Sequence, residues 1–141
     1  MTNSTDLFLI IGATGNTGAH TVRLLREGGH RVRAFVHTLD QRSARLAEQG
    51  AEVVVGDLHD FPTVSAAITG VTAAYFNYPV APGLVEATAT FAQAASEAGV
   101  HAVVNMSQIS GDDFGALFGQ PRRTLIESVH ERANTMTAFA Q

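Results

Sequence analysis

Three glycines near the start of the chain have the spacing of a turn that binds phosphate groups. Gly12, Gly15 and Gly18 directly follow the apolar residues 7–11 and precede a segment with helical periodicity. In such a turn the first glycine permits a tight bend, the second lets the backbone approach a pyrophosphate, and the third lets the helix pack closely on the strand. The amino end of that helix presents its amides and positive dipole end to the phosphates. The turn predicts a dinucleotide site. A glycine-rich turn without a ligand is the alternative, which the flanking strand and helix disfavour.

Side chains beside this turn and after the second strand extend the same expected site. Asn16 and Thr17 stand where amides and side chains reach the phosphate oxygens. His37 follows the second strand, without the acid that NAD-binding proteins usually place there for the ribose 2′-hydroxyl. His37 and Arg42 could instead approach a 2′-phosphate, which favours NADP over NAD. The alternative is that both are solvated loop residues, with Asp40 as a helix cap.

Polar residues also follow the later strands, at the edge where parallel strands end together. Asp57 follows the third strand, where a carboxylate can accept from the adenine amine; a helix N-terminal acid is the alternative. Tyr78 and Ser107 are the polar candidates nearest to a nicotinamide, although Ser107 could equally bond to nearby backbone. The residues singled out after these strands are Asp57, Leu58, Asn77, Tyr78, Pro79 and Ser107.

The elements that must position these residues alternate regularly along the chain. The expected strands are residues 7–11, 30–36, 53–55, 73–76 and 102–106, and the expected helices are residues 17–27, 40–48, 62–68 and 82–98. This alternation predicts an α/β fold, a three-layer, Rossmann-like, doubly wound parallel sheet with strand order 3-2-1-4-5. We expect a single domain over residues 1–141, in which residues 7–110 are the core and residues 111–141 are a loop and a helix at 122–139.

Composition excludes several classes of protein. The chain has 141 residues, a net charge of −4 and no cysteine. The negative charge argues against binding to nucleic acid or to a membrane surface, and no cluster has the spacing of metal ligands. All 9 basic residues are arginine, so Schiff-base chemistry on a lysine is excluded. The polar start and the short apolar runs predict a cytoplasmic protein.

Four sequence motifs together resemble the NmrA-like family, atypical members of the short-chain dehydrogenase/reductase superfamily. The motifs are Ile11-Gly-Ala-Thr-Gly-Asn-Thr-Gly18, Val55-Gly-Asp-Leu58, Tyr75-Phe-Asn-Tyr-Pro79 and Val104-Asn-Met-Ser-Gln-Ile-Ser110. The resemblance covers residues 7–110 and implies an NAD(P)-binding Rossmann domain. It assigns phosphate binding to Gly12, Thr14, Gly15, Asn16, Thr17 and Gly18.

The chain departs from the family's pattern at three places. Histidine stands at position 37, where an arginine usually closes the second strand in NADP-binding members. The Tyr-x-x-x-Lys pair that catalytic members of the wider superfamily use is absent. Family members are also about twice as long as this chain, so a truncated chain is expected.

The resemblance implies an NAD(P)H-dependent oxidoreductase that acts on a quinone or a small carbonyl compound. A redox sensor that binds the dinucleotide without turnover, or an inactive fragment, is the alternative. Catalytic residues are unknown beyond the candidates Ser107 and Tyr78. The sequence also leaves undecided whether the alanine-rich helix 82–98 packs only on its own sheet or also against a second copy in a homodimer.

Overall fold

The computed structural model describes residues 5–106 of the chain. The chain divides into a unit of residues 1–107 and a second unit of residues 108–141. The loop expected at 111–115 and the helix expected at 122–139 therefore lie outside the described residues. The single domain over residues 1–141 stays a prediction.

Five strands and four helices alternate in the described part of the chain, as the sequence predicts. They are β1 (Leu7–Ile11), α1 (Asn16–Glu27), β2 (Arg31–Val36), α2 (Gln41–Glu48), β3 (Glu52–Val55), α3 (Phe61–Ile68), β4 (Ala73–Phe76), α4 (Leu84–Glu97) and β5 (Ala102–Asn105). The largest shift is at α4, which begins two residues after Pro82. Gly83 precedes it with φ +92°, a left-handed conformation that cannot belong to the helix.

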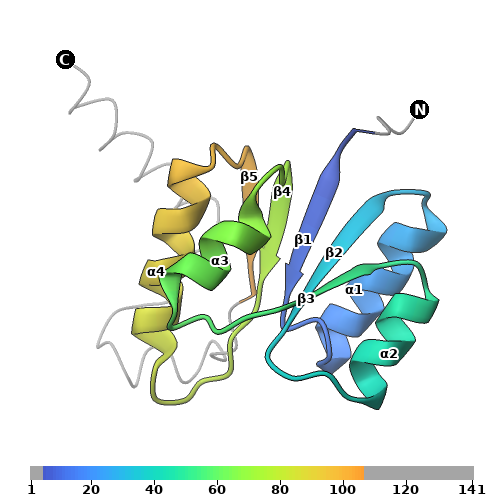
Figure 1. Ribbon diagram of the computed structural model, residues 1–141, viewed down its shortest axis with the longest axis horizontal. Helices are drawn as coiled ribbons and strands as arrows, with labels where there is room; N and C mark the ends of the chain where they lie inside the picture. Colours follow the sequence, from blue (N-terminus) through green and yellow to red (C-terminus); the bar gives the residue numbers. More distant parts are fainter. Residues whose placement is uncertain (1–4, 107–141) are drawn as a thin grey trace, which may run out of the picture. The chain divides into compact units, whose positions relative to one another are not determined.

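The strands form one parallel sheet in the order β3-β2-β1-β4-β5, which confirms the predicted doubly wound α/β fold. Figure 1 shows α1 and α2 beside the β2–β3 half of the sheet and α3 and α4 beside the β4–β5 half. The chain runs outward from β1 through β2 to β3, then crosses to β4 and continues to β5. The direction of winding therefore reverses between β1 and β4.

Alternating residues of the central strand supply two separate cores, one on each face of the sheet. Leu7, Leu9 and Ile11 pack with residues of α3 and α4, including Val64 and Phe91. The opposite face, which carries Ile10, packs with residues of α1 and α2. Burial on both faces explains why β1 is wholly apolar rather than alternating.

Several arginines are bound to the chain itself. The Arg33 guanidinium donates to the carbonyl oxygens of Ala67 and Thr69 at 2.7 and 2.9 Å, and pairs with Glu52 at 3.0 Å. Arg26 likewise donates to the carbonyl oxygens of His30 and Gln49. These arginines hold ends of elements together, which satisfies carbonyl groups that the helices and strands leave unpaired. They are therefore not free to bind a phosphate.

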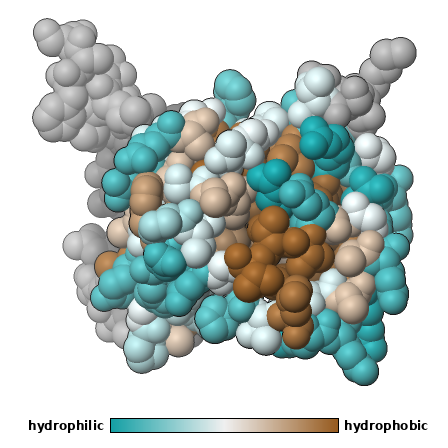
Figure 2. Space-filling view, in the orientation of Figure 1, coloured by the Kyte–Doolittle hydropathy of each residue, from teal (hydrophilic) through white to brown (hydrophobic). Residues whose placement is uncertain are grey.

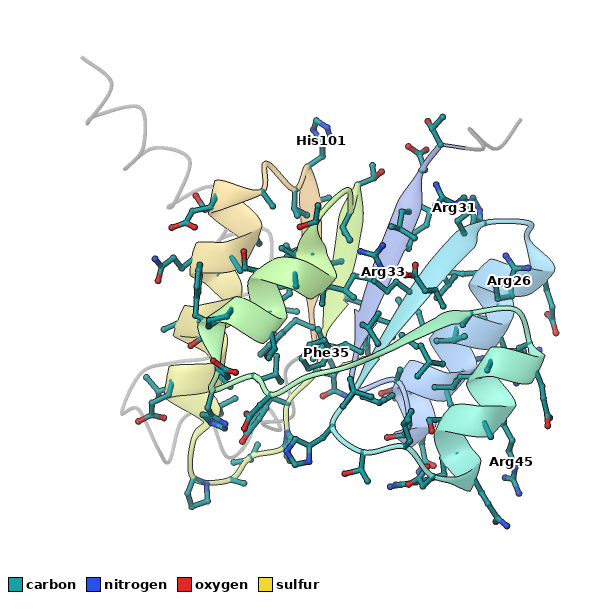
Figure 3. All side chains as sticks on the ribbon, viewed as in Figure 1. Arg26, Arg31, Arg33, Phe35, Arg45 and His101 are labelled. Carbon is teal, nitrogen blue, oxygen red and sulfur yellow. The ribbon has the colours of Figure 1, made fainter. Side chains whose placement is uncertain are left out.

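The outer strand β3 leaves apolar surface exposed. Figure 2 shows a hydrophobic patch on the face along which β3 runs in Figure 1. Val55, the last residue of β3, is 53% exposed. Figure 3 places Arg31 and His101 at the opposite edge of the sheet from the carboxyl ends of the strands. His101 is thus remote from any site at those carboxyl ends.

Candidate functional site

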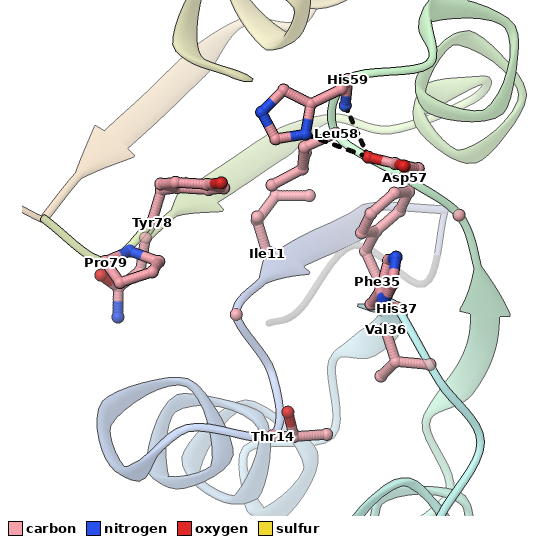
Figure 4. Close-up of a pocket in the computed structure, with 13 residues that line it drawn as sticks. Ile11, Thr14, Phe35, Val36, His37, Asp57, Leu58, His59, Tyr78 and Pro79 are labelled. Atoms are coloured by element: carbon pink, nitrogen blue, oxygen red, sulfur yellow. Dashed lines mark hydrogen bonds and ion pairs between the residues drawn. The ribbon is translucent and has the colours of Figure 1, made fainter. Parts of the chain in front are cut away.

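A pocket of about 390 Å³ lies where the carboxyl ends of four strands meet (Figure 4). Its lining includes the ends of β1 and β4, between which the winding of the sheet reverses, and open α/β sheets bind their ligands at such a point. The lining residues come from the ends of β1, β2, β3 and β4: Ile11, Gly12, Thr14, Phe35, Val36, His37, Gly56, Asp57, Leu58, His59, Asn77, Tyr78 and Pro79. Sequence analysis predicted eight of these: Gly12, Thr14, His37, Asp57, Leu58, Asn77, Tyr78 and Pro79.

The fold itself requires two of the three glycines in the turn after β1. Gly12 has φ +73°, and a Cβ there would lie 2.9 Å from the Asn77 carbonyl oxygen. A Cβ on Gly18 would overlap the carbonyl group of Gly12 and lie 2.9 Å from Ala13 Cα, so α1 packs directly on the turn. Both positions therefore need glycine for steric reasons within the chain.

Gly15 differs, because no contact among residues 5–106 requires it to be glycine. Its φ of −76° suits any residue, and a Cβ there would meet only the Gly12 carbonyl oxygen, at 3.4 Å. Gly15 is also the N-cap of α1, and it provides no side chain to the unpaired amides of the first turn. The amino end of α1 therefore keeps both open space and unpaired amide donors, the combination that suits a phosphate group.

Two side chains from β4 and the loop after it fix the Thr17 hydroxyl in this first turn. The Tyr75 hydroxyl and the Asn77 amide each donate to Thr17 Oγ1 at 3.1 Å. A hydroxyl has two acceptor positions and one donor. With both acceptor positions engaged, Thr17 can offer its hydrogen to a further acceptor. The contact also joins the glycine turn to the end of β4.

The turn after β2 holds its charges in a local arrangement. Asp40 caps α2 through the amides of Arg42 and Ser43, at 2.8 and 3.1 Å. Its other carboxylate oxygen accepts from the Arg42 guanidinium at 3.0 and 2.8 Å. These bonds hold the pKa of Asp40 below its ordinary value, and the bond from the Arg42 guanidinium has the largest effect. The expected cap is thus confirmed, and Arg42 is paired with Asp40 and does not line the pocket, whereas His37 does.

The loop after β3 brings a residue to the site that sequence analysis did not single out. The Asp57 carboxylate accepts from the backbone amide of His59 at 2.8 Å and lies 3.2 Å from its ring Nδ1. The pKa of Asp57 is lowered, and the backbone hydrogen bond from His59 is the largest cause of this shift. The bond from the His59 ring and the charges of His59 and His37 lower it further. His59 stands two residues after a predicted site residue, and that spacing was the available signal.

The remaining lining residues missed by sequence analysis form the apolar wall. Ile11, Phe35, Val36 and Gly56 end strands β1, β2 and β3. A Cβ on Gly56 would lie 2.7 Å from the Phe35 ring, so the ring packs against the backbone of the loop after β3. The predicted residues Gly15, Asn16, Thr17 and Gly18 adjoin the pocket without lining it. Ser107 lies outside the described residues.

Two negative findings apply to residues 5–106. This part of the chain holds no group of three or more His, Asp or Glu side chains placed to bind a metal ion. None of its helices combines the length and apolar character needed to cross a membrane.

Comparison with known proteins supports the sequence resemblance. The model of the NmrA-like family matches residues 4–113. A curated NAD(P)H azoreductase from Xenophilus azovorans is 36% identical over 95 residues, which cover 67% of this chain and 32% of the azoreductase.

Solved structures have the same fold. The NADPH-dependent quinone oxidoreductase QOR2 from Escherichia coli, solved with NADPH, matches with a TM-score of 0.64 and 25% identity, over 74% of this chain and 38% of the oxidoreductase. The negative transcriptional regulator NmrA, solved with NAD, matches with a TM-score of 0.71 and 22% identity, over 79% and 36% of the two chains. The chain thus spans about a third of the length of these relatives.

Proposed function

The chain belongs to the NmrA-like family, and from this premise we propose that its pocket binds a nicotinamide dinucleotide, NADP or NAD. The observation that carries the proposal is Gly15, whose lack of a side chain is not required by any contact in the described part of the chain. It leaves open the amino end of α1, which has no side-chain cap, beside a pocket at the reversal point of the sheet. A pyrophosphate fits the space and the donors available there.

The pyrophosphate would be held by the glycine turn and the first turn of α1. Thr14, Asn16 and the backbone amides up to Gly18, which adjoin Gly15 in the sequence, would contact the phosphate groups. The Thr17 hydroxyl would donate to a phosphate oxygen, since Tyr75 and Asn77 already use its acceptor positions. No other side chain has to move to free this donor.

The adenosine half would lie across the ends of β2 and β3. Asp57 would accept from the adenine amine and Leu58 would contact the ring, with the apolar strand ends as the pocket wall. His37 lines the same part of the pocket and would face the 2′ position, so NADP is preferred over NAD. Arg42 would have to release Asp40 to assist.

The reaction class we assign is that of an NAD(P)H-dependent oxidoreductase acting on a quinone or a small carbonyl compound. A reduced nicotinamide supplies the hydride when it is bound. The chain's own residues would bind and orient the two reactants, with Tyr78, and Ser107 in the part not described, as the polar groups next to them. The azoreductase and quinone oxidoreductase relatives support this class.

A dinucleotide sensor without turnover is the second candidate. The observation that favours it is the lack of lysine, which removes the usual partner of a proton-donating tyrosine. In addition, the Tyr75 hydroxyl is engaged by Thr17. Nucleotide binding is common to both candidates, so it is the property to test first.

Calorimetric titration of the whole chain with NADPH, NADH, NADP and NAD tests the proposal. We expect binding well below 1 mM, with the 2′-phosphorylated forms preferred. Oxidation of NADPH by a quinone or aldehyde panel would support the enzyme, and tight binding without oxidation would support the sensor. Lack of binding by all four forms would refute the proposed site, and a preference for NADH would contradict the role of His37.

Asp40→Asn is expected to raise the NADPH-to-NADH affinity ratio roughly 3- to 10-fold, because it releases the Arg42 guanidinium and removes a negative charge. Asparagine caps helices as well as aspartate does, so α2 should stay formed. Calorimetry at one salt concentration measures the ratio. Arg42→Gln is the matched control. If Asp40→Asn changes the affinity ratio as much in an Arg42→Gln protein as in wild type, release of the Arg42 guanidinium is not the cause of the change.

A further inference from the structure

His59 lies between the two loops that form opposite walls of the pocket. Its ring Nδ1 is 3.2 Å from the Asp57 carboxylate in the loop between β3 and α3 (Figure 4). Its Nε2 is 3.1 Å from the Gly83 carbonyl oxygen in the loop between β4 and α4. The imidazole therefore connects segments that lie 24 residues apart in the sequence.

Both groups that face the imidazole are hydrogen-bond acceptors. A neutral imidazole has one N–H and can donate to only one of them, which leaves a ring lone pair pointing at the other acceptor. An imidazolium has two N–H groups and donates to both. The geometry thus offers two bonds to the protonated ring and one to the neutral ring.

The contact on the Gly83 side is close and specific. The Gly83 carbonyl oxygen also accepts from the Ala87 amide at 2.9 Å, so His59 bonds to the N-cap carbonyl of α4. The His59 ring meets the Tyr78 ring edge-on, with the centroids 5.9 Å apart. A Cβ on Gly83 would lie 2.6 Å from His59 Nε2 and 3.2 Å from the Tyr78 hydroxyl. Glycine at this position therefore lets the histidine reach the helix.

The charged groups on the elements around His59 are three carboxylates and one histidine. Asp57 and Asp60 belong to its own loop, and Glu86 lies in the first turn of α4. His37 at the end of β2 is the other titratable cation of the pocket, and it acts on Asp57. Because hydrogen bonds from His59 lower the pKa of Asp57, that carboxylate stays an anionic acceptor through the range in which histidine titrates.

We propose that His59 is a positioning residue that, when protonated, ties the β3–α3 and β4–α4 loops together across the pocket and thereby strengthens dinucleotide binding at acidic pH. The tie itself is independent of any ligand. Its effect on affinity rests on the proposed function. Loss of the proton leaves one N–H, which stays on Nδ1 facing the Asp57 carboxylate, the stronger acceptor of the two. The Nε2 bond to Gly83 is then lost, and this loosens the wall that carries Tyr78 and Pro79.

A tryptophan reporter tests the tie in the absence of a dinucleotide. The chain has no tryptophan, and Val80 in the β4–α4 loop is 61% exposed, so Val80→Trp introduces a single fluorophore there. We expect acrylamide quenching of this indole to rise between pH 5.5 and pH 8. In the double variant with His59→Phe, which keeps an aromatic ring beside Tyr78, quenching should be high and independent of pH.

Two further variants make the reporter experiment decisive. His59→Gln keeps a neutral donor that does not titrate, so its quenching should also be flat with pH. His101→Phe removes a histidine at the opposite edge of the sheet and should leave the pH profile unchanged. If Val80→Trp shows the same profile with and without His59→Phe, the tie does not exist.

Calorimetry with NADPH then measures the effect on binding. The affinity of wild type relative to His59→Phe should be about 5-fold higher at pH 6 and equal at pH 8, the effect of one charge-assisted hydrogen bond. His37 is present in both proteins, so its contribution cancels in this ratio. A ratio that is the same at both pH values overturns the inference. A pH-dependent reporter with no NADPH binding would refute the proposed function and leave the loop tie standing.

Discussion

Gly15→Ala is expected to weaken NADPH binding at least about 100-fold while the chain folds as before, which corresponds to the loss of two charge-assisted hydrogen bonds. The added methyl group would occupy the open space at the amino end of α1 and keep the pyrophosphate away from the amides. Calorimetry measures the affinity, and thermal unfolding followed by circular dichroism measures stability.

Stability should change little in this variant for two opposing reasons. The backbone at Gly15 has φ −76°, which alanine adopts without strain, and a Cβ there meets only one atom, at 3.4 Å. Alanine is a poorer N-cap than glycine but loses less chain entropy on folding, so the net change is within about 1 kcal/mol. Unchanged NADPH affinity in a folded Gly15→Ala protein would refute the placement of the phosphates at this turn.

The arrangement of the elements could be predicted from the sequence because it follows from local patterns. Apolar runs such as residues 7–11 indicate strands buried on both faces, and the helical segments between them require parallel pairing with right-handed crossovers. The carboxyl ends of those strands must then meet at one edge. This is why seven of the eight predicted pocket residues could be predicted from their position after a strand, whereas Thr14 was assigned by the family resemblance.

The contacts that organise the site could not be predicted, because they depend on side-chain rotamers and on distant segments. Arg42 has the charge to bind a 2′-phosphate, but the Asp40 side chain that caps α2 also accepts from its guanidinium. In the sequence, nothing distinguishes His59 from an ordinary loop residue. Only the fold brings the Gly83 carbonyl oxygen, 24 residues further along the chain, to 3.1 Å from His59 Nε2. Likewise, Pro82 suggests the first residue of a helix, and only the left-handed conformation of Gly83 moves the start to Leu84.

Gly18→Ala is expected to have the opposite effect, a loss of about 3 kcal/mol of folding free energy, because the methyl group overpacks a backbone contact. Its Cβ would overlap the Gly12 carbonyl and crowd Ala13, both of which are backbone atoms that cannot rotate away. The helix α1 must move off the turn, and this opens the core around Val22, which is fully buried. The midpoint of thermal unfolding should fall by about 10 °C.

The two glycine variants are each other's control, since the same methyl group is added three residues apart in one turn. Gly15→Ala should lose the ligand and keep the fold, whereas Gly18→Ala should lose stability whether or not NADPH is present. A Gly18→Ala protein as stable as wild type would show that α1 does not pack on the turn as closely as the structure has it. If both variants lost stability equally, Gly15 would have a structural role, and the argument that its missing side chain makes room for a dinucleotide would fail.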